Sequence, residues 1–357
     1  MDELTRRHAN VRQAMARDGL DAVIVSGSEY TGFEGAVTYM SGFTIVHRYA
    51  YVLLPREGEA AIVFPTEARY VGEHGETPLE QVFADKPGEW LAGRLRGKRV
   101  GIYGLDYVMA VRDFVALSDK AELVPWDVEF DLARAVKSEA ELESVRESVR
   151  INTEGFRLFL RHFEPGKTAA EVLAPAEEHF VRRGCRRLTM NMVLAGPEFA
   201  LAREDMRLGD FCLPSLEVAG PGGHWVEVSR AIGKPTREVE RMLEAYQQYF
   251  STARTELRPG ATAHDVHRAV SRGFTELGYH LGHVTGHSIG MTMIEFPKIG
   301  EGVETELAEN MVFSMHPHAI SADGRECLYM QDTWLVTAKG GEPLADLPME
   351  VFSGALA

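Results

Sequence analysis

The sequence EPGKTAAEV at residues 164–172 returns 94 positions later as RPGATAHDV at residues 258–266. The correspondence extends past the motif, because Phe180 and Phe274 stand at the same offset. Each copy predicts a turn followed by a helix with a threonine at its N-cap. A duplicated unit indicates a domain of two pseudo-symmetric halves that share a central sheet and a cleft. Alternatively, Pro-Gly-x-Thr is only a common signal for the start of a helix.

The C-terminal part of the chain, residues 136–357, carries long amphipathic helical patterns around these copies. Helices are predicted at residues 138–162, 168–183, 236–256 and 262–277, with strands between them. Ser138 and Glu141 have the spacing of a capping box at the start of the first helix. This region therefore reads as an α+β domain.

The N-terminal part, residues 1–135, has short β-branched runs alternating with helical segments. Strands are predicted at residues 22–25, 51–54, 60–64, 100–103 and 122–125, and helices at residues 4–18 and 109–118. This pattern is typical of an α/β domain, so the 357-residue chain is expected to form two domains.

The composition narrows the class of partner. A formal net charge of −15 provides no basic field for nucleic acid or for anionic lipid. The apolar runs are too short to span a bilayer, and the polar N-terminus lacks the apolar core of a signal peptide. The chain has 3 cysteines, an odd number that argues against a disulfide framework. We therefore expect a cytoplasmic protein that acts on a small molecule.

Five segments of the C-terminal part carry polar residues that could do chemistry. They read GDF at 209–211, GHWVEVSR at 223–230, TGHSIG at 285–290, NMVFSMHP at 310–317 and LYMQDTWLVT at 328–337. In this order they resemble the creatinase, prolidase and aminopeptidase P family, and residues 1–135 resemble the N-terminal domain of that family. The resemblance implies a pita-bread fold for residues 136–357.

The resemblance also identifies the positions of the metal ligands. In the metal-dependent members, two aspartates, one histidine and two glutamates hold two divalent ions. Here the second aspartate corresponds to Glu227, the histidine is kept as His287, and the glutamates become His316 and Gln331.

The first aspartate position is ambiguous. It falls on Leu216, or on Glu217 if the loop at residues 219–223 carries a one-residue deletion. These ligand positions supply at most two negative charges, where four are customary around two divalent ions. A two-ion cluster is therefore not expected.

The favoured hypothesis is a creatinase-like hydrolase or lyase that works without a metal cofactor. It would cleave a C–N bond in a small polar, nitrogen-containing substrate, with His287 and His316 transferring protons. Glu227 would orient an imidazole or the substrate nitrogen.

Two alternatives remain open. In the first, His287, His316, Glu227 and Glu217 bind one zinc, iron or manganese ion in a hydrolase that resembles the Xaa-Pro dipeptidases. In the second, the chain is a catalytically inactive pita-bread binding protein. The histidines also have ordinary explanations, since His287 could cap a turn and His316 could form a buried pair with His318.

Five residues are candidates for binding substrate: Arg325, His283, Gln331, Glu217 and Arg48. By resemblance, Arg325 would face a substrate carboxylate and His283 would be a second cleft histidine, although each could instead be a solvated turn residue. The loop that carries Arg48 reaches the neighbouring subunit's cleft in related dimers, so the resemblance implies a homodimer.

Overall fold

The computed structural model describes residues 2–29, 34–45, 47–72, 77–185, 191–195 and 200–353. The chain divides into two compact units, which are described separately below. The N-terminal unit comprises Met1–Arg134 with Met291–Met293, and the C-terminal unit comprises Ala135–Gly290 with Ile294–Ala357. Within the described ranges, every helix is too short or too polar to cross a membrane.

The N-terminal unit is built on a six-stranded mixed sheet with the order β4-β3-β2-β1-β5-β6. Its strands are β1 (Ala22–Ser28), β2 (Tyr49–Pro55), β3 (Ala61–Pro65), β4 (Glu80–Ala84), β5 (Arg99–Tyr103) and β6 (Glu122–Pro125). Its helices are α1 (Glu3–Arg17), α2 (Glu34–Ser41), the 3-10 turn η1 (Thr66–Ala68), α3 (Arg69–Gly72), α4 (Pro87–Leu95), α5 (Val111–Ser118) and α6 (Asp127–Ala135).

The central strand β1 shows why the α/β class of this unit could be predicted from the sequence. All seven of its residues are buried. Val23 and Val25 enter one apolar cluster, whereas Ala22 and Ile24 enter another. Successive side chains of a strand point to opposite faces, so an uninterrupted apolar run predicts a strand covered on both sides. The predicted α/β class is confirmed, but α2, α3, α4, α6 and β4 were not predicted.

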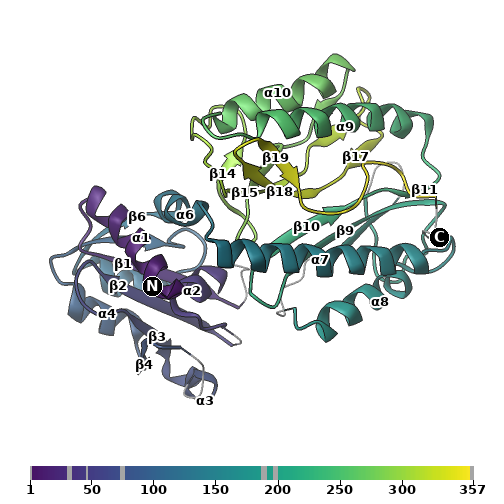
Figure 1. The fold of residues 1–357 in the computed structure, drawn as a ribbon. Helices are drawn as coiled ribbons and strands as arrows, with labels where there is room; N and C mark the ends of the chain where they lie inside the picture. The colour runs from purple at the N-terminus through teal and green to yellow at the C-terminus, as the bar shows by residue number, and fades with distance from the viewer. Residues whose placement is uncertain are drawn as a thin grey trace. The chain divides into compact units, whose positions relative to one another are not determined.

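The C-terminal unit contains two pairs of long helices with strands between them (Figure 1). The helices α7 (Glu139–His162) and α8 (Ala169–Arg182) lie on one side of the strands, and α9 (Arg237–Glu256) and α10 (Ala263–Glu276) lie on the other. All four are helices that the sequence predicts. The observed arrangement confirms the pita-bread class.

The strands of this unit form three sheets, with the orders β10-β9-β7-β8, β12-β16-β17 and β14-β13-β15-β18-β19, and β11 pairs with β9. The first sheet and β11 contain β7 (Met192–Ala195), β8 (Ala200–Leu201), β9 (Phe211–Ala219), β10 (Trp225–Ser229) and β11 (Ile232–Gly233). The others contain β12 (His280–Leu281), β13 (Gly286–Ser288), β14 (Glu295–Ile299), β15 (Val312–Met315), β16 (His318–Ile320), β17 (Cys327–Tyr329), β18 (Asp332–Thr337) and β19 (Gly340–Pro343).

The two repeat copies have equivalent structures. Thr168 is the N-cap of α8 and Thr262 is the N-cap of α10, and each threonine accepts a backbone hydrogen bond from the third helical residue. Each also forms an isolated bridge to a later segment, Thr168 with Arg207 and Thr262 with Glu306. The internal pseudo-two-fold repeat is therefore confirmed.

An isolated bridge links the two five-stranded sheets. The N–H groups of Ser229 and Gln331 each donate to the other residue's carbonyl oxygen at 3.2 Å. Close by, the backbone N–H of Glu227 donates to the Thr333 hydroxyl at 3.0 Å. This junction brings side chains of β10 into contact with residues that lie about 100 positions later in the chain.

Candidate functional site

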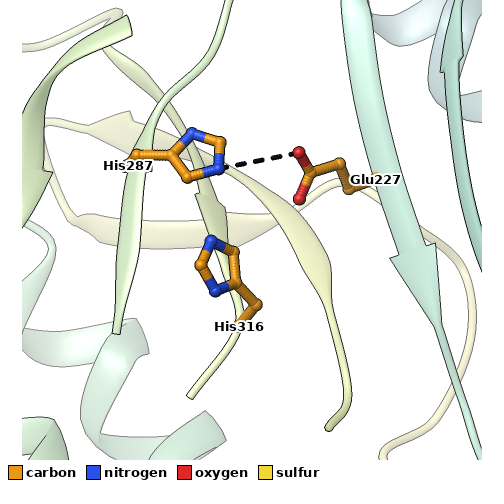
Figure 2. A group of neighbouring side chains, drawn as sticks. All are labelled: Glu227, His287 and His316. Carbon is orange, nitrogen blue, oxygen red and sulfur yellow. Dashed lines mark ion pairs between the residues drawn. The ribbon is translucent and has the colours of Figure 1, made fainter. Parts of the chain in front are cut away.

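Three buried side chains of the C-terminal unit converge near this junction (Figure 2). Glu227 lies on β10, His287 lies on β13, and His316 directly follows β15. Each offers a ligand atom, and these atoms all lie within 4.8 Å of one another. The two imidazole ring centroids are 4.9 Å apart.

Local backbone packing places the two histidines. Strands β13 and β15 are antiparallel neighbours in which Gly286 pairs with Met315 and His287 pairs with Ser314. A Cβ atom on Gly286 would lie only 2.5 Å from the Ser314 carbonyl oxygen. The glycine before His287 therefore permits the close approach of the two strands. Beyond the strand, the backbone N–H of His316 donates to the Thr285 carbonyl at 2.9 Å.

The strand register places Glu217, not Leu216, beside Glu227. Strands β9 and β10 are antiparallel, and Glu217 is the direct partner of Glu227. Leu216 pairs with Val228, so its side chain points to the opposite face of the sheet. Glu217 is nevertheless outside the group of three converging ligand atoms.

Gln331 joins the two carboxylates. Its Nε2 lies 3.1 Å from Glu217 Oε1 and 3.1 Å from Glu227 Oε2. The side-chain oxygen Oε1 of Gln331 accepts a hydrogen bond from the Ser215 hydroxyl at 2.5 Å, and Nε2 also lies 2.9 Å from the Tyr329 hydroxyl. The carboxamide is thus held at both ends.

Two hydroxyl groups lie beside the carboxylates. Ser314 donates to Glu227 Oε2, whereas the Ser215 hydroxyl, whose single hydrogen points to Gln331, lies 3.1 Å from Glu217 Oε1. Ser215, Ser314 and Tyr329 were not among the predicted site residues. Each stands two positions before a predicted one in the sequence. Since residues two apart on a strand share a face, that spacing is the signal that could have found them.

Burial shifts the pKa values of both carboxyl groups upward. Burial, and next the neighbouring charge of Glu227, raise the pKa of Glu217 to about 8. Burial raises the pKa of Glu227 to about 7, although the hydrogen bond from Ser314 opposes this shift. A nearby positive charge would therefore stabilise the ionised form of each carboxyl group.

Both histidines are held in the neutral form, which can bind a metal ion. Burial lowers the pKa of His287, and burial with the charges of His287 and His283 lowers that of His316 well below its usual range. His287 Nδ1 lies 2.9 Å from the Ser288 carbonyl oxygen, which can only accept, so Nδ1 carries the proton. The lone pair of His287 Nε2 therefore faces Glu227 Oε1, at 3.7 Å.

His287 Nε2 and Glu227 Oε1 are both hydrogen-bond acceptors, and their separation would allow both to bind the same cation. Ligands with bonds of about 2.1 Å to one tetrahedral zinc ion are about 3.4 Å apart. The His287–Glu227 separation of 3.7 Å is close to this spacing. Two imidazoles and one carboxylate are also a common ligand set for zinc and for iron. Glu227, His287 and His316 can thus hold one divalent ion.

The other predicted residues lie at varying distances from this group. His283 is exposed, and its ring centroid is 5.0 Å from that of His316. Arg325 is 84% exposed in a hairpin, where its guanidinium lies 3.9 Å from Asp323. Arg48 belongs to the N-terminal unit, where its backbone N–H donates to Glu29. The structure therefore brings His283 to the site and leaves Arg325 in a solvated turn.

Comparison with known proteins shows two family matches and several full-length relatives. The sequence model of metallopeptidase family M24 matches residues 143–338, and that of the creatinase/prolidase N-terminal domain matches residues 7–136. A probable dipeptidase PepE of Mycobacterium bovis is 27% identical, covering 97% of this chain and 95% of its own. An Xaa-Pro dipeptidase of Pyrococcus horikoshii is 22% identical, covering 98% and 100%. The dipeptidase PepE structure of Mycobacterium ulcerans has a TM-score of 0.81 at 22% identity, covering 98% and 97%.

These findings correct two expectations. The expectation of no metal cofactor is wrong, because the matched family is one of metallopeptidases and Glu227, His287 and His316 form a buried ligand group. The metal-independent, creatinase-like cleavage of a non-peptide substrate is not supported either, because the relatives are named as dipeptidases. The findings instead favour the alternative of a single-ion hydrolase that resembles the Xaa-Pro dipeptidases.

Proposed function

The chain belongs to metallopeptidase family M24, and from that premise we propose that it is a divalent-metal-dependent hydrolase of dipeptides. The observation that carries the proposal is the pair of facing acceptors, His287 Nε2 and Glu227 Oε1, in a buried site that His316 completes. The names of the full-length relatives, dipeptidase and Xaa-Pro dipeptidase, support a dipeptide as the substrate class.

Glu227, His287 and His316 would hold a zinc, iron or manganese ion. When bound, such an ion polarises a carbonyl oxygen and acidifies a bound water. Neighbouring residues fix the orientation of the ligand side chains. The Ser288 carbonyl fixes the tautomer of His287, and Ser314 holds Glu227 Oε2 so that Oε1 faces the imidazole.

Substrate would approach along the side of the site that carries His283. A cavity of about 540 Å³ adjoins this residue, and His267, Tyr279, His280 and Glu301 also line it. Its volume lies within the usual range for small-molecule sites. His283 would contact the substrate there, since it lines the cavity and its ring packs against that of His316.

The test is removal and return of the metal. Purified protein would be stripped with a chelator, reloaded with zinc, manganese or iron(II), and assayed on Xaa-Pro dipeptides, other dipeptides and creatine. We expect dipeptide hydrolysis that disappears on stripping and returns with metal. His287→Ala should abolish it, whereas His162→Ala, which removes an exposed histidine at the end of α7, should not. Activity that survives stripping, or cleavage of creatine in preference to dipeptides, would contradict the proposal.

A further inference from the structure

The carboxamide of Gln331 lies against both carboxylates, at Glu217 Oε1 and at Glu227 Oε2. Glu227 Oε1 faces His287, whereas Glu227 Oε2 accepts hydrogen bonds from Ser314 and Gln331. Glu217, which is outside the three-ligand group, contacts the same amide nitrogen. Glu227 therefore directs one oxygen at the candidate ion and the other at the amide, which also contacts Glu217.

The orientation of this amide follows from its neighbours. The Ser215 hydroxyl donates to the Gln331 oxygen, and the amide nitrogen lies between the two carboxylates. When both carboxylates are ionised, turning the amide over would place its oxygen against two carboxylate oxygens, with no hydrogen between them. The amide thus presents its partial positive charge to both carboxylates at once.

Charge balance limits the number of ions that this site can hold. Glu217 and Glu227, if ionised, supply two negative charges, which one divalent ion neutralises, because the imidazoles are uncharged. A second divalent ion would leave two uncompensated positive charges in a buried site, which is strongly unfavourable. Among the described residues, no further acidic side chain joins the ligand group.

We propose that the Gln331 carboxamide takes the place of a second cation, so that this chain binds one metal ion where its two-ion relatives bind two. Gln331 is a positioning residue in this account, since its amide nitrogen contacts both Glu217 and Glu227. The proposal rests on the metal-dependent function proposed above. It predicts that Gln331→Glu, which restores a carboxylate at this position, creates a second metal site.

Manganese provides a readout that does not depend on activity. The full-length protein would be stripped, titrated with Mn²⁺ and analysed by calorimetry and electron paramagnetic resonance. Wild type should bind one ion per chain with an isolated six-line signal. Gln331→Glu should bind two ions with a spin-coupled signal, whereas Gln247→Glu, which adds the same charge on the exposed surface of α9, should bind one.

Two ions in wild type, or one ion in a folded Gln331→Glu variant, would overturn the inference and leave the metal-dependent function intact. No ion in wild type would defeat the function itself. If Gln331→Glu does not fold, Gln331→Asp gives a second test, because it also places a carboxylate at this position. It should bind two ions, and one ion in the folded variant would overturn the inference.

Discussion

Glu217 and Glu227 are direct partners in the β9–β10 ladder, so two carboxyl groups share one buried face of the sheet. In the metal-free protein, the Gln331 amide contacts both carboxyl groups, Ser314 donates to Glu227, and the raised pKa of each group keeps it partly protonated, which reduces their repulsion. The repulsion between the two carboxylates therefore lowers the stability of the metal-free protein, and a bound cation would offset it. The predictions below follow from this relationship and from the packing around it.

The metal-free protein should lose stability as pH rises. Glu217 has a folded-state pKa of about 8, above the ordinary value of 4.5, so ionising it favours unfolding. The penalty is absent below about pH 4, grows as pH rises, and is complete above about pH 8. Glu217→Gln should remove roughly 2–4 kcal/mol of this pH-dependent loss. Thermal unfolding in chelator from pH 5 to 8.5 would show parallel curves for both proteins if the idea is incorrect.

Metal binding should release protons at acidic pH. The pKa of Glu227 is raised to about 7, so below that pH the ion must displace a proton from a ligand. The neutral histidines add no such competition, because burial lowers their pKa values. Calorimetry in buffers of different ionisation enthalpy should find roughly one to two protons released at pH 6 and fewer at pH 9. Equal release at both pH values would contradict the assignment of Glu227 as a ligand.

Removing the hydroxyl that holds Glu227 should weaken metal binding. Ser314→Ala deletes the donor to Glu227 Oε2 and frees the carboxylate to rotate. Loss of such an outer contact lowers metal affinity by roughly 10-fold or more. Competition with a chromogenic chelator would measure the change, with Ser251→Ala, an exposed serine on α9, as the control. Equal affinities in the two variants would show that Ser314 does not orient the ligand.

Gly286→Ala should displace the backbone of β13 and so disturb the metal site. Its Cβ would lie 2.5 Å from the Ser314 carbonyl and 2.7 Å from the Met315 sulfur, so β13 must shift and carry His287 with it. We expect a loss of roughly 1–3 kcal/mol in the free energy of unfolding. Metal affinity should fall as well. Gly209→Ala, where an added Cβ meets no atom within 4 Å, is the matched control for chemical denaturation.

Local signals in the sequence predicted the fold well. The capping box of Ser138 and Glu141 is present at the start of α7, and the N-cap threonines of α8 and α10 were predicted from the repeat. These features depend on residues three positions apart, which a sequence displays directly. The choice between Leu216 and Glu217 depended instead on the register of β9 against β10, which a one-residue change in the connecting loop would reverse.

The chemistry of the site was harder to predict. The sequence supplied His287, His316 and Glu227 but not their mutual distance. Charge counting argued against two ions, but it did not decide between one ion and none. The tautomer of His287, set by the Ser288 carbonyl, and the lone pair that consequently faces Glu227 are visible only in the structure. The roles of Arg325, Arg48 and a homodimer stay predictions.

Anomalous diffraction at the zinc absorption edge, from crystals of the stripped and zinc-reloaded protein, tests the central claim most directly. We expect one strong peak between the Glu227 carboxylate and the imidazoles of His287 and His316, within bonding distance of all three, and no such peak in crystals of His287→Ala. A reloaded wild-type crystal with no peak at this position, or with its only peak elsewhere, would contradict the account.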